Sequence, residues 1–338
     1  MPNKSLILMN MGGATTKTEL EMFLLNMFRD PNILTIRSDF FRGLLARFIT
    51  KKRLDASWAN YEKIGGSPLP AITDELVKNL QNQHEDILVR SVMTYTHPTN
   101  NEVIEELREK GIQEITLFPL YPHYSTTTVK SSVDSFLDTM RKARLVPVIL
   151  NEAERSEASR VSENTIAVRI IEPFYRNERY NNIIIEIIRG ILSQTERDSP
   201  KENDKNEYEL VFSAHGLPEK IVKKGDPYQS QIEDHVAILT RNLRERNIHF
   251  SGIHLAYQSR VGPMKWIGPS LHEKLGELSG KKVIIFPLSF TIDNSETKFE
   301  LDIEYREIAA EHDISEYHVC PCPNARGEFQ DFLSSFLE

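Results

Sequence analysis

The sequence predicts an α/β fold made of two similar halves, each a parallel sheet flanked by helices. Three apolar segments recur in the same order in both halves. Each is short enough for a buried strand and runs into a polar or glycine-containing turn. Helical stretches lie between them, and strands that alternate with helices are typical of parallel sheets. The matching pairs are residues 6–13 and 209–216, 91–98 and 253–260, and 114–121 and 282–289.

The chain opens with a strand, a turn and a helix. Residues 5–10 form the expected strand and lead into Gly12 and Gly13, and Thr16 and Glu19 then make a capping-box pattern. This turn is neither G-x-G-x-x-G nor a P-loop, so it indicates nucleotide binding only weakly. The helix that follows carries an apolar stripe of Leu20, Phe23, Leu24, Met27 and Phe28.

The length of 338 residues predicts two domains. The polar stretch at residues 151–164 favours a boundary there, which gives an N-terminal domain at 1–160 and a C-terminal domain at 161–338. We expect a final helix at residues 325–337 to pack at the domain junction through one apolar stripe. The stripe consists of Phe329, Phe332, Leu333 and Phe336.

Composition excludes several classes of protein. The net charge of −8 argues against a general nucleic-acid binder. Cys320 and Cys322 are too few for a disulfide framework or an all-cysteine iron–sulfur cluster, and they fit a reducing compartment. No signal peptide or spanning helix is evident. We therefore expect a cytoplasmic protein, in free solution or attached to a membrane surface. We also expect a monomer, although nothing in the composition sets the oligomeric state.

Residues 40–53 combine apolar and basic side chains with no acidic residue among them. One interpretation is a helix packed on its own core with a solvated basic face. The other is an exposed apolar, cationic surface that meets a membrane or an apolar dianionic ligand.

Acidic residues and a histidine follow strands of the second half. Glu296, Glu300 and Glu304 share one helix face after the strand at 283–288, where they make either a cation path or a solvated surface. His215 follows another strand and can act as a base or a metal ligand. His nitrogen with carboxylate oxygen suits borderline divalent metals such as ferrous iron.

Ligands of open parallel sheets bind beyond the carboxyl ends of the strands. A cleft between the two halves would collect these positions from both, and Tyr121 and Tyr124 could face a flat ligand there. The strand-end positions are 11–13, 95–98, 121–128, 215–216, 258–262 and 290–296.

Five motifs together resemble the ferrochelatases, the enzymes that insert ferrous iron into a porphyrin. They run in family order from residue 6 to about residue 323, so the resemblance covers nearly the whole chain. It implies two Rossmann-like domains with the active-site cleft between them. The motifs are LMNMGG, YPHYSTTT, FSAHGLP, QSRVGPMKWIGP and SETKFELDIEY.

The resemblance also implies roles for individual residues. His215 matches the family histidine that serves as metal ligand or as acceptor of pyrrole protons, and Glu296 matches its partner glutamate. Glu300 and Glu304 match an acidic relay for iron or protons, and residues 37–53 match a hydrophobic lip. Met11, Tyr124 and Trp266 match positions close to the macrocycle, and we add the strand-end residues Tyr95 and Ser125 as substrate-binding candidates.

Two positions depart from the family pattern. Asn294 stands where many members have histidine, so a mechanism with a second imidazole there is not expected. Thr94 stands where many have arginine, so a contact to a substrate carboxylate is lost or moved, for example to an arginine of the lip.

The expected activity is that of a lyase: insertion of ferrous iron into protoporphyrin IX, with release of two protons, to give protohaem. His215 is the expected base, because two N–H protons must leave, and Glu296 is expected to hold the metal. Porphyrin and Fe2+ are then substrates, and no cofactor or nucleic-acid partner is expected. The alternatives are a coproporphyrin ferrochelatase, a cobalt chelatase of another tetrapyrrole, and a non-catalytic tetrapyrrole- or metal-binding protein.

Overall fold

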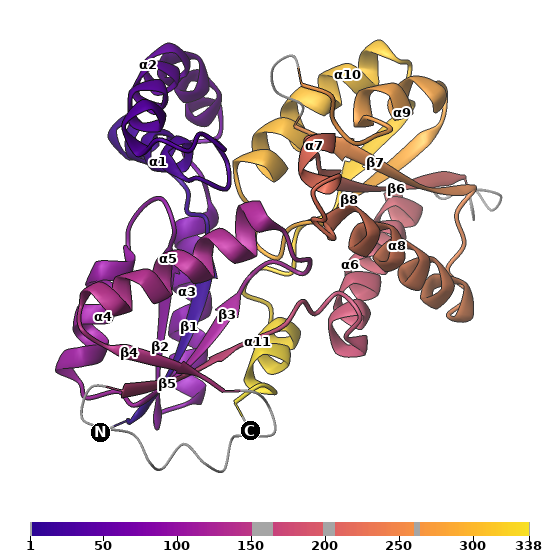
Figure 1. Ribbon diagram of the computed structural model, residues 1–338. Helices are drawn as coiled ribbons and strands as arrows, with labels where there is room; N and C mark the ends of the chain where they lie inside the picture. The colour runs from indigo at the N-terminus through magenta and orange to yellow at the C-terminus, as the bar shows by residue number, and fades with distance from the viewer. Residues whose placement is uncertain (1, 151–164, 199–206, 260–263, 338) are drawn as a thin grey trace. The chain divides into compact units, whose positions relative to one another are not determined.

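The structure is a computed structural model that describes residues 2–150, 165–198, 207–259 and 264–337 (Figure 1). It divides into two compact units. Unit 1 contains Met1–Tyr121, Ser125–Glu172 and Leu333–Glu338, and unit 2 contains Pro122–Tyr124 and Pro173–Phe332. The boundary expected after residue 160 lies outside the described residues. The strand that follows it belongs to the sheet of unit 1.

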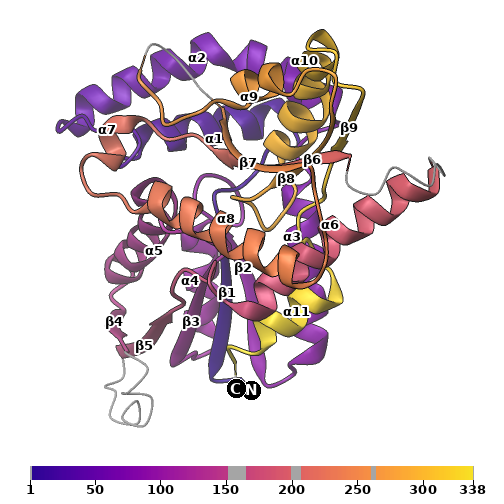
Figure 2. The same cartoon turned by 90° about the vertical axis from the view of Figure 1, so that its right-hand side faces the viewer.

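Unit 1 is built on a parallel sheet with the strand order β2-β1-β3-β5-β4. Helix α3 (Leu69–Gln83) lies on one face, and α4 (Asn100–Glu109) and α5 (Ser131–Lys142) lie on the other (Figures 1 and 2). The strands are β1 (Lys4–Asn10), β2 (Ile87–Met93), β3 (Glu114–Pro119), β4 (Val146–Ile149) and β5 (Thr165–Ile170).

Unit 2 repeats this plan with the parallel order β7-β6-β8-β9. Its strands are β6 (Tyr208–His215), β7 (Gly252–Gln258), β8 (Lys282–Pro287) and β9 (Glu316–Val319). Its helices are α6 (Glu178–Asp198), α7 (Glu219–Val222), α8 (Tyr228–Glu245), α9 (Leu271–Glu277) and α10 (Tyr305–Glu311), and α11 (Gly327–Ser334) closes the chain.

The two sheets confirm the fold predicted from the recurring segments. In each unit the first strand of the series lies between the second and the third, so β1, β2 and β3 correspond to β6, β7 and β8. In each unit the third strand also leads to a π-helix, a type of turn that is rare and is often found at functional sites. These are η1 (Thr126–Lys130) and η3 (Glu296–Glu304).

Buried apolar strands form the cores. Leu6, Ile7 and Leu8 of β1 are fully buried, as are Ile284 and Ile285 of β8. Such continuous burial is expected for strands covered by helices on both faces. In unit 2 one cluster joins β6, β7, β8, α9, η3 and α10, and this cluster fixes the carboxyl ends of the strands relative to η3.

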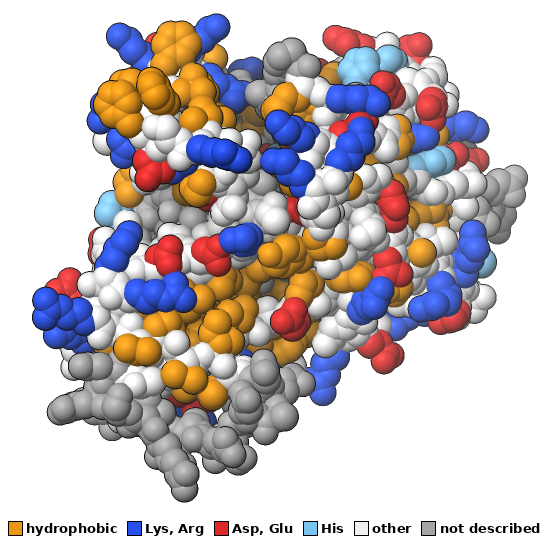
Figure 3. All heavy atoms as spheres, in the orientation of Figure 1, with side chains coloured by type: hydrophobic (Ala, Val, Ile, Leu, Met, Phe, Trp, Pro, Cys, Tyr) orange, Lys and Arg blue, Asp and Glu red, His pale blue; other side chains and the backbone are white. Residues whose placement is uncertain are grey.

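Helices α1 (Lys17–Arg29) and α2 (Asp39–Lys63) pack on each other in unit 1. The predicted α1 stripe is confirmed, because Leu20, Leu24 and Phe28 are buried and Phe23 and Met27 pack against them. The outer face of α2 instead exposes large apolar side chains, which gather over this helix in Figure 3. They are Phe40, Phe41, Leu44, Leu45 and Phe48, with exposed fractions between 37% and 71%.

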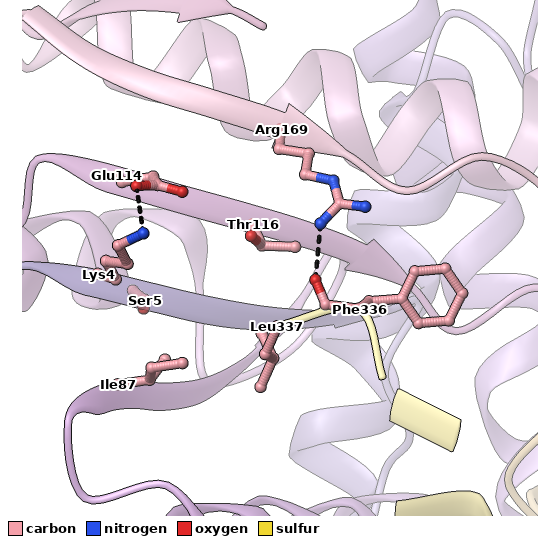
Figure 4. A pocket seen from close by; sticks show the side chains of 8 residues that line it. All are labelled: Lys4, Ser5, Ile87, Glu114, Thr116, Arg169, Phe336 and Leu337. Atoms are coloured by element: carbon pink, nitrogen blue, oxygen red, sulfur yellow. Dashed lines mark hydrogen bonds and ion pairs between the residues drawn. The ribbon is translucent and has the colours of Figure 1, made fainter. Parts of the chain in front are cut away.

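A cavity of about 130 Å³ lies near the first residues of β1, β2 and β3 (Figure 4). An ion pair between Lys4 and Glu114, 2.9 Å apart, borders it, and Arg169 donates a 2.6 Å hydrogen bond to the carbonyl of Phe336. Ligand pockets usually enclose roughly 300 Å³ or more and lie at the opposite, carboxyl end of such sheets. This cavity is therefore not the expected ligand site, and the hydrogen bond from Arg169 attaches the C-terminal segment beside it.

Candidate active site

His215 and Glu296 meet at the carboxyl edge of the unit 2 sheet. His215 is the last residue of β6, and Glu296 is the first residue of η3, which follows the neighbouring strand β8. His215 Nδ1 lies 2.8 Å from Glu296 Oε2. The glutamate that the resemblance gave as the partner of His215 is thus in direct contact with it.

The end of β7 supplies two further partners. Gln258 Nε2 donates to Glu296 Oε2 at 3.2 Å, and Ser213 Oγ donates to Gln258 Oε1 at 2.6 Å, which fixes the orientation of that amide. Ser259 Oγ lies 2.9 Å from Glu296 Oε2 and 2.5 Å from Glu300 Oε2. Its backbone N–H donates to Glu300 Oε1 at 2.7 Å, so Ser259 bridges the two carboxylates.

Ser259 makes this bridge from an unusual backbone conformation. Its φ is +63°, in the left-handed region that non-glycine residues seldom adopt and that often marks functional sites. The sequence indicated residues 258–262 as a strand end, but it did not single out Gln258 or Ser259. The QSRVGPMKWIGP motif begins with these two residues, but their roles depend on the geometry of this turn, which the motif does not report.

The backbone of His215 is held from the other side. Its N–H donates to Ser289 Oγ at 2.8 Å, and its carbonyl accepts from the Tyr228 hydroxyl at 3.0 Å. Tyr228 and Ser289 also share a 2.7 Å hydrogen bond. These bonds fix the position from which the imidazole projects.

The segment after β8 is helical, as expected, but it is wound as a π-helix over nine residues. Glu296 and Glu300 converge on Ser259, whereas Glu304 is exposed and makes no hydrogen bond to them. Asn294 Oδ1 accepts from the backbone N–H of Glu296 at 2.8 Å and so caps the helix. Asn294, one of the two positions that depart from the expected family pattern, therefore has a structural role.

Burial and mutual charge shift the pKa values of this group in different directions. Burial lowers the pKa of His215, but the charges of Glu296 and Glu300 and the hydrogen bond to Glu296 outweigh it, so the net pKa is raised. Burial raises the pKa of Glu296, but His215, Ser259 and Gln258 outweigh it and leave the net pKa lowered. Burial and the adjacent Glu296 raise the pKa of Glu300 to about 7.

Trp266 and Tyr124 also belong to unit 2. Trp266 pairs with Pro218 in an isolated bridge, and its indole N–H is buried without a partner among the described residues. A Cβ on Gly216 would come within 3.4 Å of the indole ring and 2.8 Å of the Gln258 carbonyl. Glycine beside His215 therefore allows the backbone carbonyl of Gln258 to approach closely, and Trp266 packs against the same glycine.

Met11, Tyr95 and Ser125 lie in unit 1. Tyr95 is 4% exposed and donates to Asp30 Oδ2 at 2.7 Å, and Ser125 is 1% exposed and caps η1 by accepting from the Thr127 N–H. Only Met11 of the three is partly exposed. The hydroxyl of Thr94, the other position that departs from the expected family pattern, lies 2.8 Å from Ser132 Oγ.

The described residues contain no group of three or more His, Cys, Asp or Glu side chains arranged to hold a metal. Cys320 and Cys322 are free and buried, and burial raises the pKa of both thiols. Thiols that stay protonated are poor metal ligands. His215 and Glu296 thus place one imidazole and one carboxylate in direct contact at this edge of the sheet.

None of the described helices is both long and apolar enough to cross a membrane.

Comparison with known proteins identifies the family. The ferrochelatase family model matches residues 3–338. The chain is 45% identical over 331 residues to a ferrochelatase from a Nitratiruptor species, covering 98% of this chain and 97% of that one. It is 44% identical to the ferrochelatase of Sulfurimonas denitrificans over 335 residues, 98% of both chains. It is 38% identical to that of Helicobacter pylori over 338 residues, all of this chain and 93% of that one.

The fold is also seen in a solved structure. SirB from Bacillus subtilis with Fe3+ superposes with a TM-score of 0.56 at 10% identity, covering 100% of this chain and 95% of that one. The similarity of the sheets agrees with the sequence matches along the whole chain. The protein belongs to the ferrochelatase family and is a lyase that inserts metal into a porphyrin.

Proposed function

We propose that the chain inserts ferrous iron into protoporphyrin IX, with release of two protons, and that His215 and Glu296 carry the reaction. The contact between His215 Nδ1 and Glu296 Oε2 is the observation that supports this proposal most directly. A carboxylate oxygen only accepts hydrogen bonds, so a neutral His215 keeps its proton on Nδ1. Its Nε2 lone pair is then available to accept a proton from a pyrrole nitrogen.

Arrival of the metal would prepare the base. The charge of Glu296 raises the pKa of His215 and so favours the imidazolium. A divalent cation at Glu296 opposes that charge and lowers the pKa of the histidine. The imidazole then loses its extra proton as the metal arrives and becomes a base when pyrrole protons must leave.

Glu300 is the proposed acceptor for protons that leave this pair. Its pKa of about 7 lets the carboxyl gain and lose a proton near neutrality. It shares Ser259 with Glu296, so a short hydrogen-bonded path joins the two carboxyl groups. Glu304 is exposed one turn further along η3, where it would pass protons or iron to and from solvent.

The outer face of α2 supports the proposal that the substrate is an apolar macrocycle. It exposes Phe40, Phe41 and Phe48, each with 64% to 71% of its surface accessible. We propose Met11, Tyr124 and Trp266 as the residues that contact the ring. Tyr95 and Ser125 would act indirectly, by stabilising the structure of unit 1, because their hydroxyls are buried and hydrogen bonded.

The test is anaerobic incubation of the purified chain with Fe2+ and protoporphyrin, with coproporphyrin in parallel, followed by the porphyrin absorbance bands. Turnover of protoporphyrin supports the proposal. Turnover of coproporphyrin alone changes the substrate, and preference for cobalt changes the metal. Binding of both porphyrins without turnover would leave a non-catalytic tetrapyrrole-binding protein.

The same face of α2 is proposed to meet an anionic membrane surface. Arg47, Lys51 and Lys52 are exposed on the helix that carries the apolar side chains, although the chain as a whole has a charge of −8. Apolar insertion together with basic side chains is the pattern of interfacial helices. Co-sedimentation with phosphatidylserine vesicles should exceed that with phosphatidylcholine vesicles, and Phe48→Glu should abolish it. Equal recovery of the variant would contradict the proposal.

A further inference from the structure

A short turn after β3 is attached to α8 by side chains that the proposed reaction does not use. Pro122–Tyr124 belongs to unit 2, although Tyr121 and Ser125 on either side belong to unit 1. The N–H of Tyr124 donates to Gln231 Oε1 at 2.7 Å, and the carbonyl of Pro122 accepts from the N–H of Tyr175 at 3.2 Å. These contacts fix the backbone on both sides of His123.

His123 makes the third attachment through a buried pair of imidazoles. Its Nε2 lies 2.9 Å from Nδ1 of His235, which is four residues from Gln231 on the same face of α8. His123 is 2% exposed and His235 is fully buried. His235 Nε2 lies 2.8 Å from Oδ1 of Asn181 on α6, so the chain of contacts crosses two helices of unit 2.

The direction of each hydrogen bond follows from Asn181. Its amide oxygen can only accept, so His235 carries its proton on Nε2 and offers the Nδ1 lone pair. His123 must then donate from its own Nε2. Burial lowers the pKa of both histidines, that of His235 to about 3, so neither becomes charged near neutrality. The pair is a fixed chain of neutral hydrogen bonds rather than a proton relay.

The pair also touches the residue that holds His215. The His123 ring stacks on Tyr175 at 5.5 Å and meets the edge of the Tyr228 ring at 6.1 Å between centroids. Tyr228 is the residue whose hydroxyl donates to the carbonyl of His215. His123 therefore packs between the turn that carries Tyr124 and the side chain that anchors the proposed base.

We propose that His235 and Asn181 are positioning residues for porphyrin binding, and that they act through His123 on Tyr124. The inference rests on the proposed function, in which Tyr124 contacts the macrocycle. Loss of the His235 acceptor leaves a buried N–H of His123 unpaired, and the free-energy cost of an unpaired buried donor favours a shift of the imidazole toward another acceptor. That movement would displace the turn at Tyr124 while Glu296 and its metal-facing partners stay in place.

The test compares steady-state kinetics of His123→Leu, His235→Ala and His123→Gln with the unaltered enzyme. We expect His123→Leu and His235→Ala to raise KM for porphyrin roughly tenfold and to leave KM for Fe2+ and kcat within about twofold. This pattern indicates the loss of an interaction that stabilises the bound substrate and the transition state equally. His123→Gln retains an N–H donor near the position of Nε2 and should restore KM for porphyrin. His254→Ala is the control, because it removes a partly buried imidazole of unit 2 that is also paired with a side chain, that of Glu209, and it should leave both KM values unchanged.

A second measurement does not depend on activity. Imidazole 15N spectra of the unaltered protein should show both histidines as neutral Nε2–H tautomers between pH 5 and 8. Titration of either ring near pH 6.5 would overturn the inference. So would an unchanged porphyrin KM in folded His235→Ala, or a fall in kcat with both KM values unchanged, which would mean only a loss of active protein. Failure of the unaltered chain to bind any porphyrin would instead overturn the proposed function, and the positioning role with it.

Discussion

His215 and Glu296 meet although 81 residues separate them, and neighbouring strands explain why. β6 and β8 pair in parallel register from Tyr208 to Ser213, so their carboxyl ends reach the same edge of the sheet. Residues that follow adjacent strands then lie within hydrogen-bonding distance. Prediction from strand ends therefore identified both residues, whereas it could not rank the other residues at the same edge.

Ser259 provides a test of the bridge between Glu296 and Glu300. We expect Ser259→Ala to lower kcat about tenfold with little change in KM for porphyrin, because the two carboxylates lose the hydroxyl that holds them together. The Ser259 hydrogen bond also lowers the pKa of Glu300, so its loss should move that pKa above 7. The acid limb of the kcat profile then shifts to higher pH.

Steady-state rates between pH 5.5 and 8.5 measure both effects. Ser259→Thr keeps the hydroxyl and should recover most of the rate. A tenfold change in KM for porphyrin with kcat intact would contradict the assignment of Ser259 to the carboxylates.

Gly12 is a second residue whose identity is set by local geometry. Its φ is +106°, and a Cβ there would lie 2.2 Å from Thr96 Oγ1. We expect Gly12→Ala to destabilise the protein by about 3 kcal/mol, measured from the urea midpoint, because steric overlap adds to backbone strain. Gly111→Ala is the control: its φ is also positive, at +67°, but no atom lies within 4 Å of the added Cβ. An equal loss in both variants would show that strain alone accounts for the effect.

Among the elements, the helices after β2 and β7 begin in the same way. Thr99 and Glu102 form a capping box at the start of α4, and Ser270 and Glu273 form one at the start of α9. In each case the hydroxyl accepts a backbone N–H that the helix itself cannot pair, and the glutamate accepts the N–H of the capping residue. The repeated sequence segments are thus accompanied by repeated local structure beyond the strands.

The two caps lead to a prediction about stability. Thr99→Ala and Ser270→Ala should each lower the free energy of unfolding by about 1 kcal/mol. Because the residues belong to different units and share no hydrogen-bonding partner, the double variant should lose about 2 kcal/mol. Thr99→Ser keeps the hydroxyl and should be close to neutral. A double variant no weaker than either single one would contradict the independence of the caps.

Sequence periodicity did not predict that η3 is a π-helix. A spacing of four residues placed Glu296, Glu300 and Glu304 on one face, and it treated the three as equivalent. The wider turn brings Glu296 and Glu300 together at Ser259 and leaves Glu304 exposed. Periodicity reports which residues share a face of a helix, but it does not report how the helix is wound.

For the molecule as a whole, order along the chain was more predictable than contacts between distant segments. The recurring segments predicted two parallel sheets, and both sheets have the same order of their first three strands. Burial was harder to foresee: Tyr95 and Ser125 follow strands, as Met11 does, yet their hydroxyls are turned into unit 1. The hydrogen bond between His123 and His235 was not predicted, because 112 residues separate them and neither belongs to a periodic pattern.

That pair should also influence how the whole chain responds to acid. The unfolded chain protonates each histidine near pH 6.5, whereas burial lowers the pKa of His235 in the folded chain to about 3 and that of His123 well below its usual value. Between these limits the unfolded state binds protons that the folded state does not, so stability is fully present above pH 6.5 and falls as the pH decreases. Each such histidine contributes a slope of about 1.4 kcal/mol per pH unit.

The surroundings of the pair do not offset this effect. Tyr175, Tyr180 and Tyr228 face the imidazoles as neutral phenols, since burial raises the pKa of all three. Asp234 is the adjacent carboxylate on α8, and Arg176 already pairs with it at 2.7 Å. Urea unfolding between pH 4 and 7 measures how the free energy of unfolding falls with decreasing pH. This fall should be less steep for His235→Asn than for the unaltered chain, by roughly the slope that one histidine contributes. Replacement of the exposed His249 by asparagine should leave the slope unchanged, and an equal effect of the two substitutions would mean that the buried pair is protonated in the folded protein.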